Sequence, residues 1–143
     1  MKKLLFACLL MVAQSGYSAD LTEVRISGEK INGCNLSMNS VAASLGATMR
    51  YNRINLTEKF GGVNLYHAVT AHSNGGQCAT FVKVEFKIYE YVFVKNLNQK
   101  IMSSVVLCGN GTLLTGPSYD MQTRVNDAAK DMAQQCLLEI SKQ

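Results

Sequence analysis

The cysteines are the residues of this 143-residue chain that are best suited to chemistry. After Cys8 they are widely spaced, at Cys34, Cys78, Cys108 and Cys136. No Cys-x-x-Cys pair is present, so zinc-ribbon and thioredoxin-like sites lack their usual spacing. In an oxidising compartment an even number of such cysteines favours two disulfides. Of the three possible pairings we expect Cys34–Cys78 and Cys108–Cys136, since each would tie a helix or its leading loop to a sheet.

The other ionisable residues form no catalytic or metal-binding pattern. The two histidines, His67 and His72, would point to opposite faces of a strand, so they cannot share a metal ion. Glu85 and Glu90 also have opposite strand parity, which prevents the convergence of two carboxylates that a glycosidase needs. We therefore predict no catalytic residue, no metal site, no cofactor and no enzymatic activity.

The first nineteen residues have the layout of a bacterial secretory signal peptide. A basic start (MKK) precedes an apolar run over residues 4–13, and small residues precede a cleavage point after Ala19. The run is shorter than the roughly 20 residues that span a bilayer. We predict a cleaved signal at residues 1–19, a single periplasmic domain at residues 20–143, and no membrane insertion of the mature chain.

Lipid attachment and nucleic-acid binding are both disfavoured. Attachment of lipid would use Cys8, but the bulky Phe6 before it and the short run upstream argue against a lipoprotein signal. Loss of Lys2 and Lys3 lowers the formal charge from +4 to +2, because the chain has 14 basic and 10 acidic residues. No basic run is left, so the composition does not indicate a nucleic-acid partner.

Two amphipathic helices are expected at the ends of the mature chain. In residues 37–51 apolar residues recur at helical spacing, and Ser37 is a suitable N-cap. A longer helix is predicted after Pro117, with Ser118 as its cap and Asp120 in the first turn, where the helix dipole favours an acid. Its apolar stripe consists of Met121, Val125, Ala128, Ala129, Met132, Cys136 and Ile140.

The segment between the helices has the alternation of an antiparallel sheet. Residues 63–72 form one strand, SNGG makes a hairpin turn, and the next strand covers residues 81–94. From Val82 to Ile88 its even-numbered residues are apolar and the intervening ones are charged. NLNQK and the GNG of residues 109–111 are expected to turn the chain around a further strand. The sequence thus predicts an α+β fold, with an antiparallel sheet of about four strands flanked by an N-terminal helix and a long C-terminal helix.

Aromatic residues replace charged ones towards the end of the strand at residues 81–94. Tyr89, Tyr91 and Phe93 share the strand parity of the lysines before them, so a polar face becomes aromatic. Exposed aromatic side chains are typical of contact surfaces, and a homodimer through sheet faces or edges is the simplest use. The alternative is that one of the helices covers this end of the sheet.

A short polar loop is the second candidate contact. The segment GEKINGC carries Glu29, Lys30 and Asn32, and it ends at a cysteine that would hold it in place. Rigid polar loops lose little entropy on docking, which suits an inhibitor. GNGT, which contains Asn110, is a candidate by the same reasoning. The alternative for both segments is a plain connection between two elements.

In size and layout the chain resembles the small periplasmic immunity proteins of type VI secretion systems. The shared features are a signal ending in GYSA, a short mature domain, a helix–sheet–helix order and paired cysteines. It is most similar to those that protect a cell from the muramidase domain of its own secreted spike protein. The resemblance implies a protein, often a homodimer, that inserts side chains into the substrate cleft of a peptidoglycan-cleaving toxin.

The expected function is therefore that of a periplasmic immunity protein that binds and occludes a peptidoglycan muramidase. Two other functions fit the same residues. One is a structural or assembly accessory subunit of an envelope secretion or pilus machine, and the other is an inhibitor of host lysozyme. The first alternative predicts a stable complex with envelope components and no effect on lytic activity.

Overall fold

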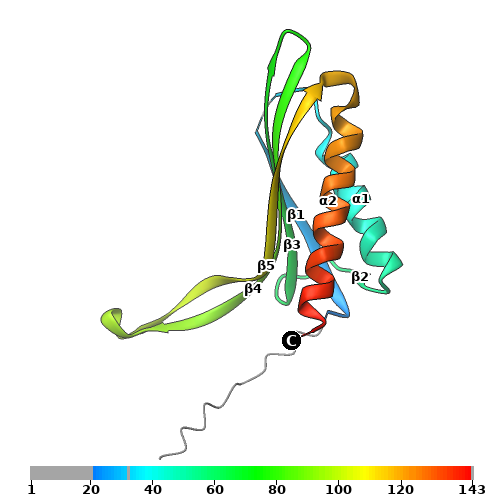
Figure 1. Cartoon of the computed structure of the whole chain (residues 1–143). Helices are drawn as coiled ribbons and strands as arrows, with labels where there is room; N and C mark the ends of the chain where they lie inside the picture. Colours follow the sequence, from blue (N-terminus) through cyan, green and yellow to red (C-terminus); the bar gives the residue numbers. More distant parts are fainter. Residues whose placement is uncertain (1–20, 32, 143) are drawn as a thin grey trace, which may run out of the picture.

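Five strands and two α-helices follow one another in residues 21–31 and 33–142, the part of the chain that the computed structural model describes (Figure 1). The predicted signal peptide, Cys8 and Asn32 lie outside these residues. The strands are β1 (Glu23–Ile31), β2 (Asn55–Leu56), β3 (Val63–Asn74), β4 (Gln77–Val94) and β5 (Gln99–Pro117). The helices are α1 (Met38–Tyr51), α2 (Ser118–Ile140) and the short 3-10 helix η1 (Lys95–Leu97).

The strands form one mixed sheet in the order β2-β1-β3-β4-β5. β3, β4 and β5 are antiparallel neighbours, whereas β1 is parallel to both β2 and β3. This follows from the connection, because α1 lies between β1 and the strands that flank it, and parallel strands need such a crossover. The predicted α+β class and both predicted helices are confirmed. The sheet differs from the expected one in having five strands and a parallel part.

β5 passes without interruption through residues that were expected to turn the chain. Gly109, Asn110 and Gly111 are strand residues paired with β4, so the predicted GNG turn is wrong. The two glycines leave room for large side chains of β4. A Cβ atom at Gly111 would lie 2.8 Å from the ring of Phe81, and one at Gly109 would lie 3.0 Å from the side chain of Glu85. Close packing between strands therefore explains the glycines.

The turn between β3 and β4 has the expected chemistry. Gly75 and Gly76 form a two-residue connection with φ angles of 56° and 80°, which suit glycine in a tight hairpin. The carbonyl oxygen of Gly76 accepts hydrogen bonds from the backbone N–H and the hydroxyl of Ser118, at 2.9 and 3.0 Å. The N-cap position of α2 belongs to Pro117, so the prediction that Ser118 caps this helix is wrong.

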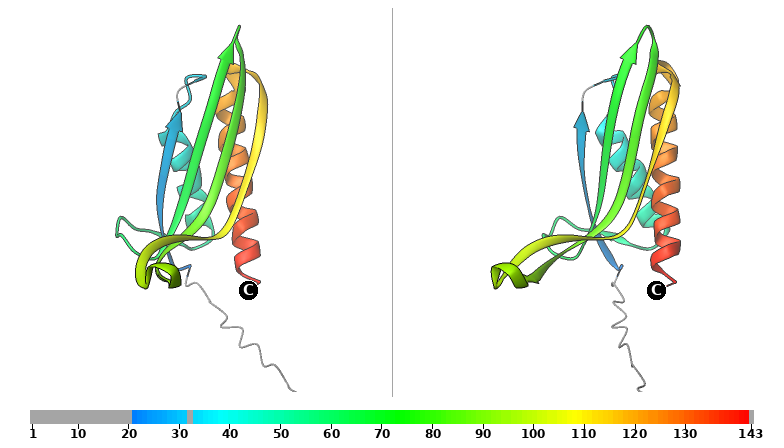
Figure 2. Two further views of the ribbon diagram at one scale, coloured as in Figure 1. Left: turned by 90° about the vertical axis from the view of Figure 1, so that its left-hand side faces the viewer. Right: turned by 60° about the vertical axis from the view of Figure 1, so that its left-hand side comes forward.

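Both helices pack against the same face of the sheet (Figure 2). Polar contacts join the two helices: Oε1 of Gln122 accepts a hydrogen bond of 2.6 Å from the backbone N–H of Ser37, and Nδ2 of Asn126 donates one of 2.9 Å to Ser40. The largest fully buried side chains of the core are those of Phe86, Leu45, Met49, Leu65 and Met121.

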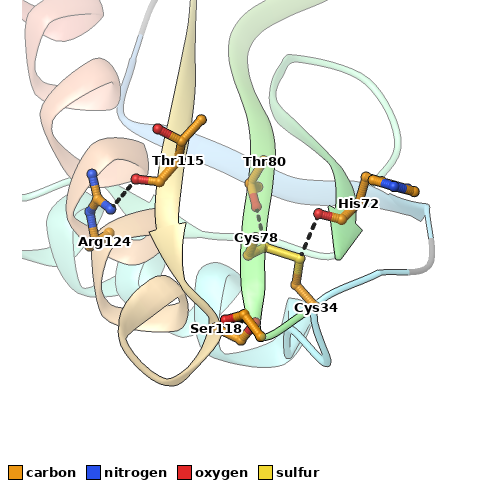
Figure 3. The surroundings of a disulfide bond; sticks show 8 residues. Cys34, His72, Cys78, Thr80, Thr115, Ser118 and Arg124 are labelled. Carbon is orange, nitrogen blue, oxygen red and sulfur yellow. Dashed lines mark hydrogen bonds between the residues drawn. A yellow bond between two sulfur atoms is a disulfide. The ribbon is translucent and has the colours of Figure 1, made fainter. Parts of the chain in front are cut away.

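Two disulfides tie the helical layer to the sheet. Cys34, in the connection between β1 and α1, is bonded to Cys78 of β4, and Cys108 of β5 is bonded to Cys136 of α2. This is the pairing that the sequence predicts. Figure 3 shows the first bridge, where the hydroxyl of Thr80 lies 3.1 Å from the sulfur of Cys78. Cys34 has a positive φ of 57°, so the chain turns sharply at the bridge.

Replacement of both Cys108 and Cys136 with alanine should lower the free energy of unfolding by about 3–4 kcal/mol, because the bridge restricts the unfolded chain. Urea denaturation followed by circular dichroism measures this loss. The matched pair of changes at Cys34 and Cys78 should cost at least as much, since these cysteines are separated by 44 residues instead of 28. Losses of less than about 1 kcal/mol in both variants would contradict this account.

Candidate functional site

The sheet face opposite the helices carries interlocked charged and aromatic side chains. We call it the open face; it consists of the odd-numbered residues of β4 and their neighbours on the adjoining strands. Glu85 lies between two lysines there, 2.6 Å from Nζ of Lys83 and 2.7 Å from Nζ of Lys87. Nζ of Lys87 also lies 4.0 Å from the ring centre of Tyr66, on β3. These contacts cover the middle of the open face with paired charges.

Electrostatics keep Glu85 ionised. Burial alone would raise the pKa of Glu85, but hydrogen bonds from Lys83 and Lys87, together with their charges, lower it below the ordinary value. Burial raises the pKa of Tyr66, and the hydrogen bond and negative charge of Glu29 raise it further. At neutral pH Glu85 is therefore ionised and Tyr66 is neutral.

A cation–aromatic cluster lies where the open face meets the first residues of β3. The guanidinium of Arg25, on β1, is 4.7 Å from the ring centre of Phe60, in the connection between β2 and β3. The ring of Phe60 lies 6.0 Å from that of Tyr89. Three segments that are distant in sequence meet at this point, which the sequence analysis did not anticipate because Phe60 lies outside any periodic pattern.

Beyond this cluster, β4 and β5 continue as a two-stranded projection. β3 pairs with β4 only as far as Ile88, opposite Val63, and a bulge shifts the register between β4 and β5 next to Phe86. Bulges bend strands, and the projection leaves the rest of the sheet at a steep angle (Figures 1 and 2). We call residues 89–106 the distal hairpin; its last two residues, Val105 and Val106, pair with Ile88 and Lys87 at the margin of the three-stranded part.

Apolar side chains are exposed on both faces of the distal hairpin. Tyr91 is 68% exposed and Phe93 is 55% exposed, so the alternative that a helix covers these aromatics is wrong. The register places Met102 beside Tyr91 on one face and Ile101 beside Val92 on the other. The exposed large apolar residues here are Tyr89, Tyr91, Val92, Phe93, Leu97, Ile101, Met102, Val105 and Val106. Such a concentration of exposed apolar side chains is typical of a contact surface.

The β5 half of this surface was missed in the sequence analysis, although a signal for it exists. The segment IMSSVV, residues 101–106, contains two pairs of adjacent apolar residues. In a strand, adjacent residues point to opposite faces. Adjacent apolar residues near the start of this long strand therefore indicate a segment that is apolar on both faces.

The residues expected to be displayed on polar loops are not brought together. Glu29 and Lys30 belong to β1, which continues to Ile31, so the first part of GEKINGC is strand and the loop interpretation is wrong there. Asn110 lies within β5, and its Nδ2 donates a hydrogen bond of 3.7 Å to the sulfur of Cys136 on the helical side. Glu29 instead faces Tyr66 on the open face.

The two histidines lie on opposite faces of β3, as predicted. His72 is exposed, whereas His67 is only 3% exposed. The ring of His67 fills the space beside Gly28, where a Cβ atom would come within 2.2 Å of it. Its Nδ1 has no hydrogen-bond partner among the described residues. Burial lowers the pKa of His67 below the ordinary value of 6.5, so the ring is neutral at pH 7.

Residues 21–31 and 33–142 form several grooves, one of them lined by Asn110, but no metal-binding cluster. In these residues no group of three or more His, Cys, Asp or Glu side chains is placed to hold a metal ion, and no helix combines the length and apolar character of a membrane span. A groove of about 440 Å³ lies between α1 and α2, away from every predicted site residue. Its lining consists of Ala47, Thr48, Tyr51, Lys130, Asp131 and Gln134.

Comparisons with known proteins give only remote similarities. No protein-family model matches the chain, and no curated protein matches it in sequence. A minor lipoprotein from Acinetobacter baumannii is similar in structure, with 14% identity and a TM-score of 0.42 over 85% of this chain and 94% of that chain. A PelC dodecamer from Paraburkholderia phytofirmans has 14% identity and a TM-score of 0.45 over 84% and 86%. Similarities of this size assign neither a function nor a partner to the chain.

Replacement of Glu85 with glutamine should lower the free energy of unfolding at pH 7 by about 1–2 kcal/mol, because Lys83 and Lys87 lose their charged partner. The pKa of Glu85 is lower in the folded chain than in the unfolded one. Its stabilising effect is therefore present above the unfolded pKa and is lost as the pH falls through the folded value. Urea denaturation should show a difference in the free energy of unfolding between the unaltered chain and Glu85→Gln at pH 7, and this difference should shrink at pH 3. The matched variant Glu90→Gln should change little at either pH.

Acidification should also destabilise the chain through His67. Its pKa is lower in the folded chain than the ordinary 6.5, so below that pH the unfolded chain binds a proton that the folded chain does not. The free energy of unfolding should then fall by up to about 1.4 kcal/mol per pH unit. Between pH 7 and pH 5 the free energy of unfolding of His67→Met should lack this dependence on pH. The control variant His72→Gln should retain it. An unchanged slope in His67→Met would refute the assignment.

Proposed function

We propose that this protein is a structural or assembly accessory subunit of the cell envelope, and that it acts by binding protein through the distal hairpin. The observation that carries this proposal is the exposure of large apolar side chains on both faces of that hairpin, including Tyr91 and Phe93. A hairpin of two strands is at best marginally stable alone in water. Binding would cover its apolar surface and add strands or side chains to it.

The covalent chemistry supports a location outside the cytoplasm. Two disulfides between the helices and the sheet are typical of proteins in oxidising compartments. The predicted signal peptide at residues 1–19 agrees with this, and we propose the periplasm as the destination. A small chain stapled in this way holds its projecting hairpin on a rigid base, which lowers the entropy lost on binding.

Protection against a muramidase stays a prediction, and we prefer assembly for two structural reasons. An inhibitor that enters a substrate cleft was expected to display a polar loop, but Glu29 lies in a strand and the Asn110 amide contacts the Cys136 sulfur. The main exposed feature is apolar instead. Peptidoglycan lysis by a purified muramidase toxin tests the alternative, since an immunity protein would abolish lysis by its own toxin at equimolar concentration.

Tyr91→Ser combined with Phe93→Ser should reduce the recovery of envelope partners at least tenfold, because the apolar contact surface is lost. The measurement is affinity purification of the tagged protein after cross-linking in intact cells, quantified by mass spectrometry. Leu113→Ser with Leu138→Ser is the matched control, since these leucines are 67% and 53% exposed and lie outside the distal hairpin. Equal recovery by both double variants would contradict the proposal.

A further inference from the structure

The β4 strand of the distal hairpin has a free backbone edge. β3 stops pairing at Ile88, so residues 89–94 are hydrogen-bonded to β5 alone. The free edge of an apolar strand is a template for the addition of another strand. The outer edge of β5 is free as well, because β5 is the last strand of the sheet.

The sequence of this edge is symmetric in residue type. Residues 91–93 are tyrosine, valine and phenylalanine, which gives aromatic, β-branched and aromatic side chains in either direction. In an antiparallel pair of two such edges, a two-fold axis at Val92 places this residue opposite its own counterpart. The same register places Tyr91 opposite Phe93 of the second copy, on one face. Aromatic and β-branched cross-strand pairs are among the most favourable in sheets.

The charges of the hairpin favour the same arrangement. Within residues 89–106 the only acid is Glu90, near the base, and the only bases are Lys95 and Lys100, near the tip. Antiparallel pairing about Val92 brings the tip of one hairpin to the base of the other, so Lys95 lies opposite Tyr89 of the second copy, one position along the strand from Glu90. Parallel pairing would place like charges side by side, which is unfavourable across strands. The charge distribution is therefore complementary to itself in the antiparallel direction.

Edge pairing would cover part of the apolar surface of the hairpin. Tyr91, Val92 and Phe93 are between 40% and 68% exposed, and they lie next to the proposed axis. The side chains of β5 lie one strand further away.

We infer that the distal hairpin binds a second copy of this chain, with the two β4 edges paired antiparallel about Val92 to give a four-stranded sheet in the order β5-β4-β4′-β5′. The inference rests on the proposed function only in treating the hairpin as a protein-binding element. It adds the identity of the partner, the pairing strand and the register.

Analytical ultracentrifugation of residues 20–143, with both disulfides intact, tests the inference. The unaltered chain should be a dimer at micromolar concentration, and Val92→Lys should raise the dissociation constant at least tenfold, because the new cation faces its own copy across the axis. Leu138→Lys is the matched control at an exposed leucine of α2 and should leave the dimer intact. A monomeric unaltered chain, or a dimer that Val92→Lys does not weaken, would overturn the inference.

A spin label attached to the cysteine of Val92→Cys tests the register. Pulsed electron paramagnetic resonance measures the distance between the two labels of the dimer. A position on the two-fold axis should give a short distance, and the same label on Leu138→Cys should give a much longer one. Circular dichroism of each variant confirms folding. A long distance between the labels at position 92 would overturn the register. A monomeric chain that sediments with anionic lipid vesicles would overturn the dimer itself. If the chain is monomeric but its hairpin still captures envelope partners, this inference fails and the proposed function stands.

Discussion

The unequal length of neighbouring strands is the constraint on which the rest of this structure depends. β4 and β5 have 18 and 19 residues, whereas β3 has 12. Where all three overlap, the sheet is wide enough to be covered by two helices on one face. Where only two strands remain, no described helix covers either face, and the same chain changes from a buried core to an exposed apolar surface. The bulge beside Phe86 lies near this boundary.

The chemistry of the uncovered face changes at the same boundary. Just before Ile88, the outward residues of β4 are Lys83, Glu85 and Lys87, which form two ion pairs and together carry a charge of +1. Further from Ile88, the open face also exposes Phe81 and Leu113. After Ile88, the outward residues are aromatic. The strand parity does not change, so the difference agrees with the proposed function, in which paired charges face solvent beside β3 and aromatic side chains bind protein beyond it. An uncovered face need not be a binding face, and the side chains distinguish the two.

Much of this fold could be predicted from the sequence, because the relevant signals are local. Helical spacing identified both helices, and alternation from Val82 to Ile88 identified the buried face of β4. The parallel position of β1 could not be predicted, since it depends on a strand far along the chain. Gly109 and Gly111 resemble turn residues, but Phe81 and Glu85 on the neighbouring strand account for them. The exposure of Tyr91 depends on where β3 begins, which no pattern within β4 reveals.

The order of the disulfides along the chain has a consequence for maturation. The bridges join the first cysteine of the described chain to the second and the third to the fourth, without interleaving. A chain that crosses a membrane from its N-terminus presents Cys34 and Cys78 to the oxidising side before Cys108 and Cys136 emerge. Oxidation in order of arrival therefore produces the native bonds directly. For the proposed export, this order predicts native pairing without a disulfide isomerase.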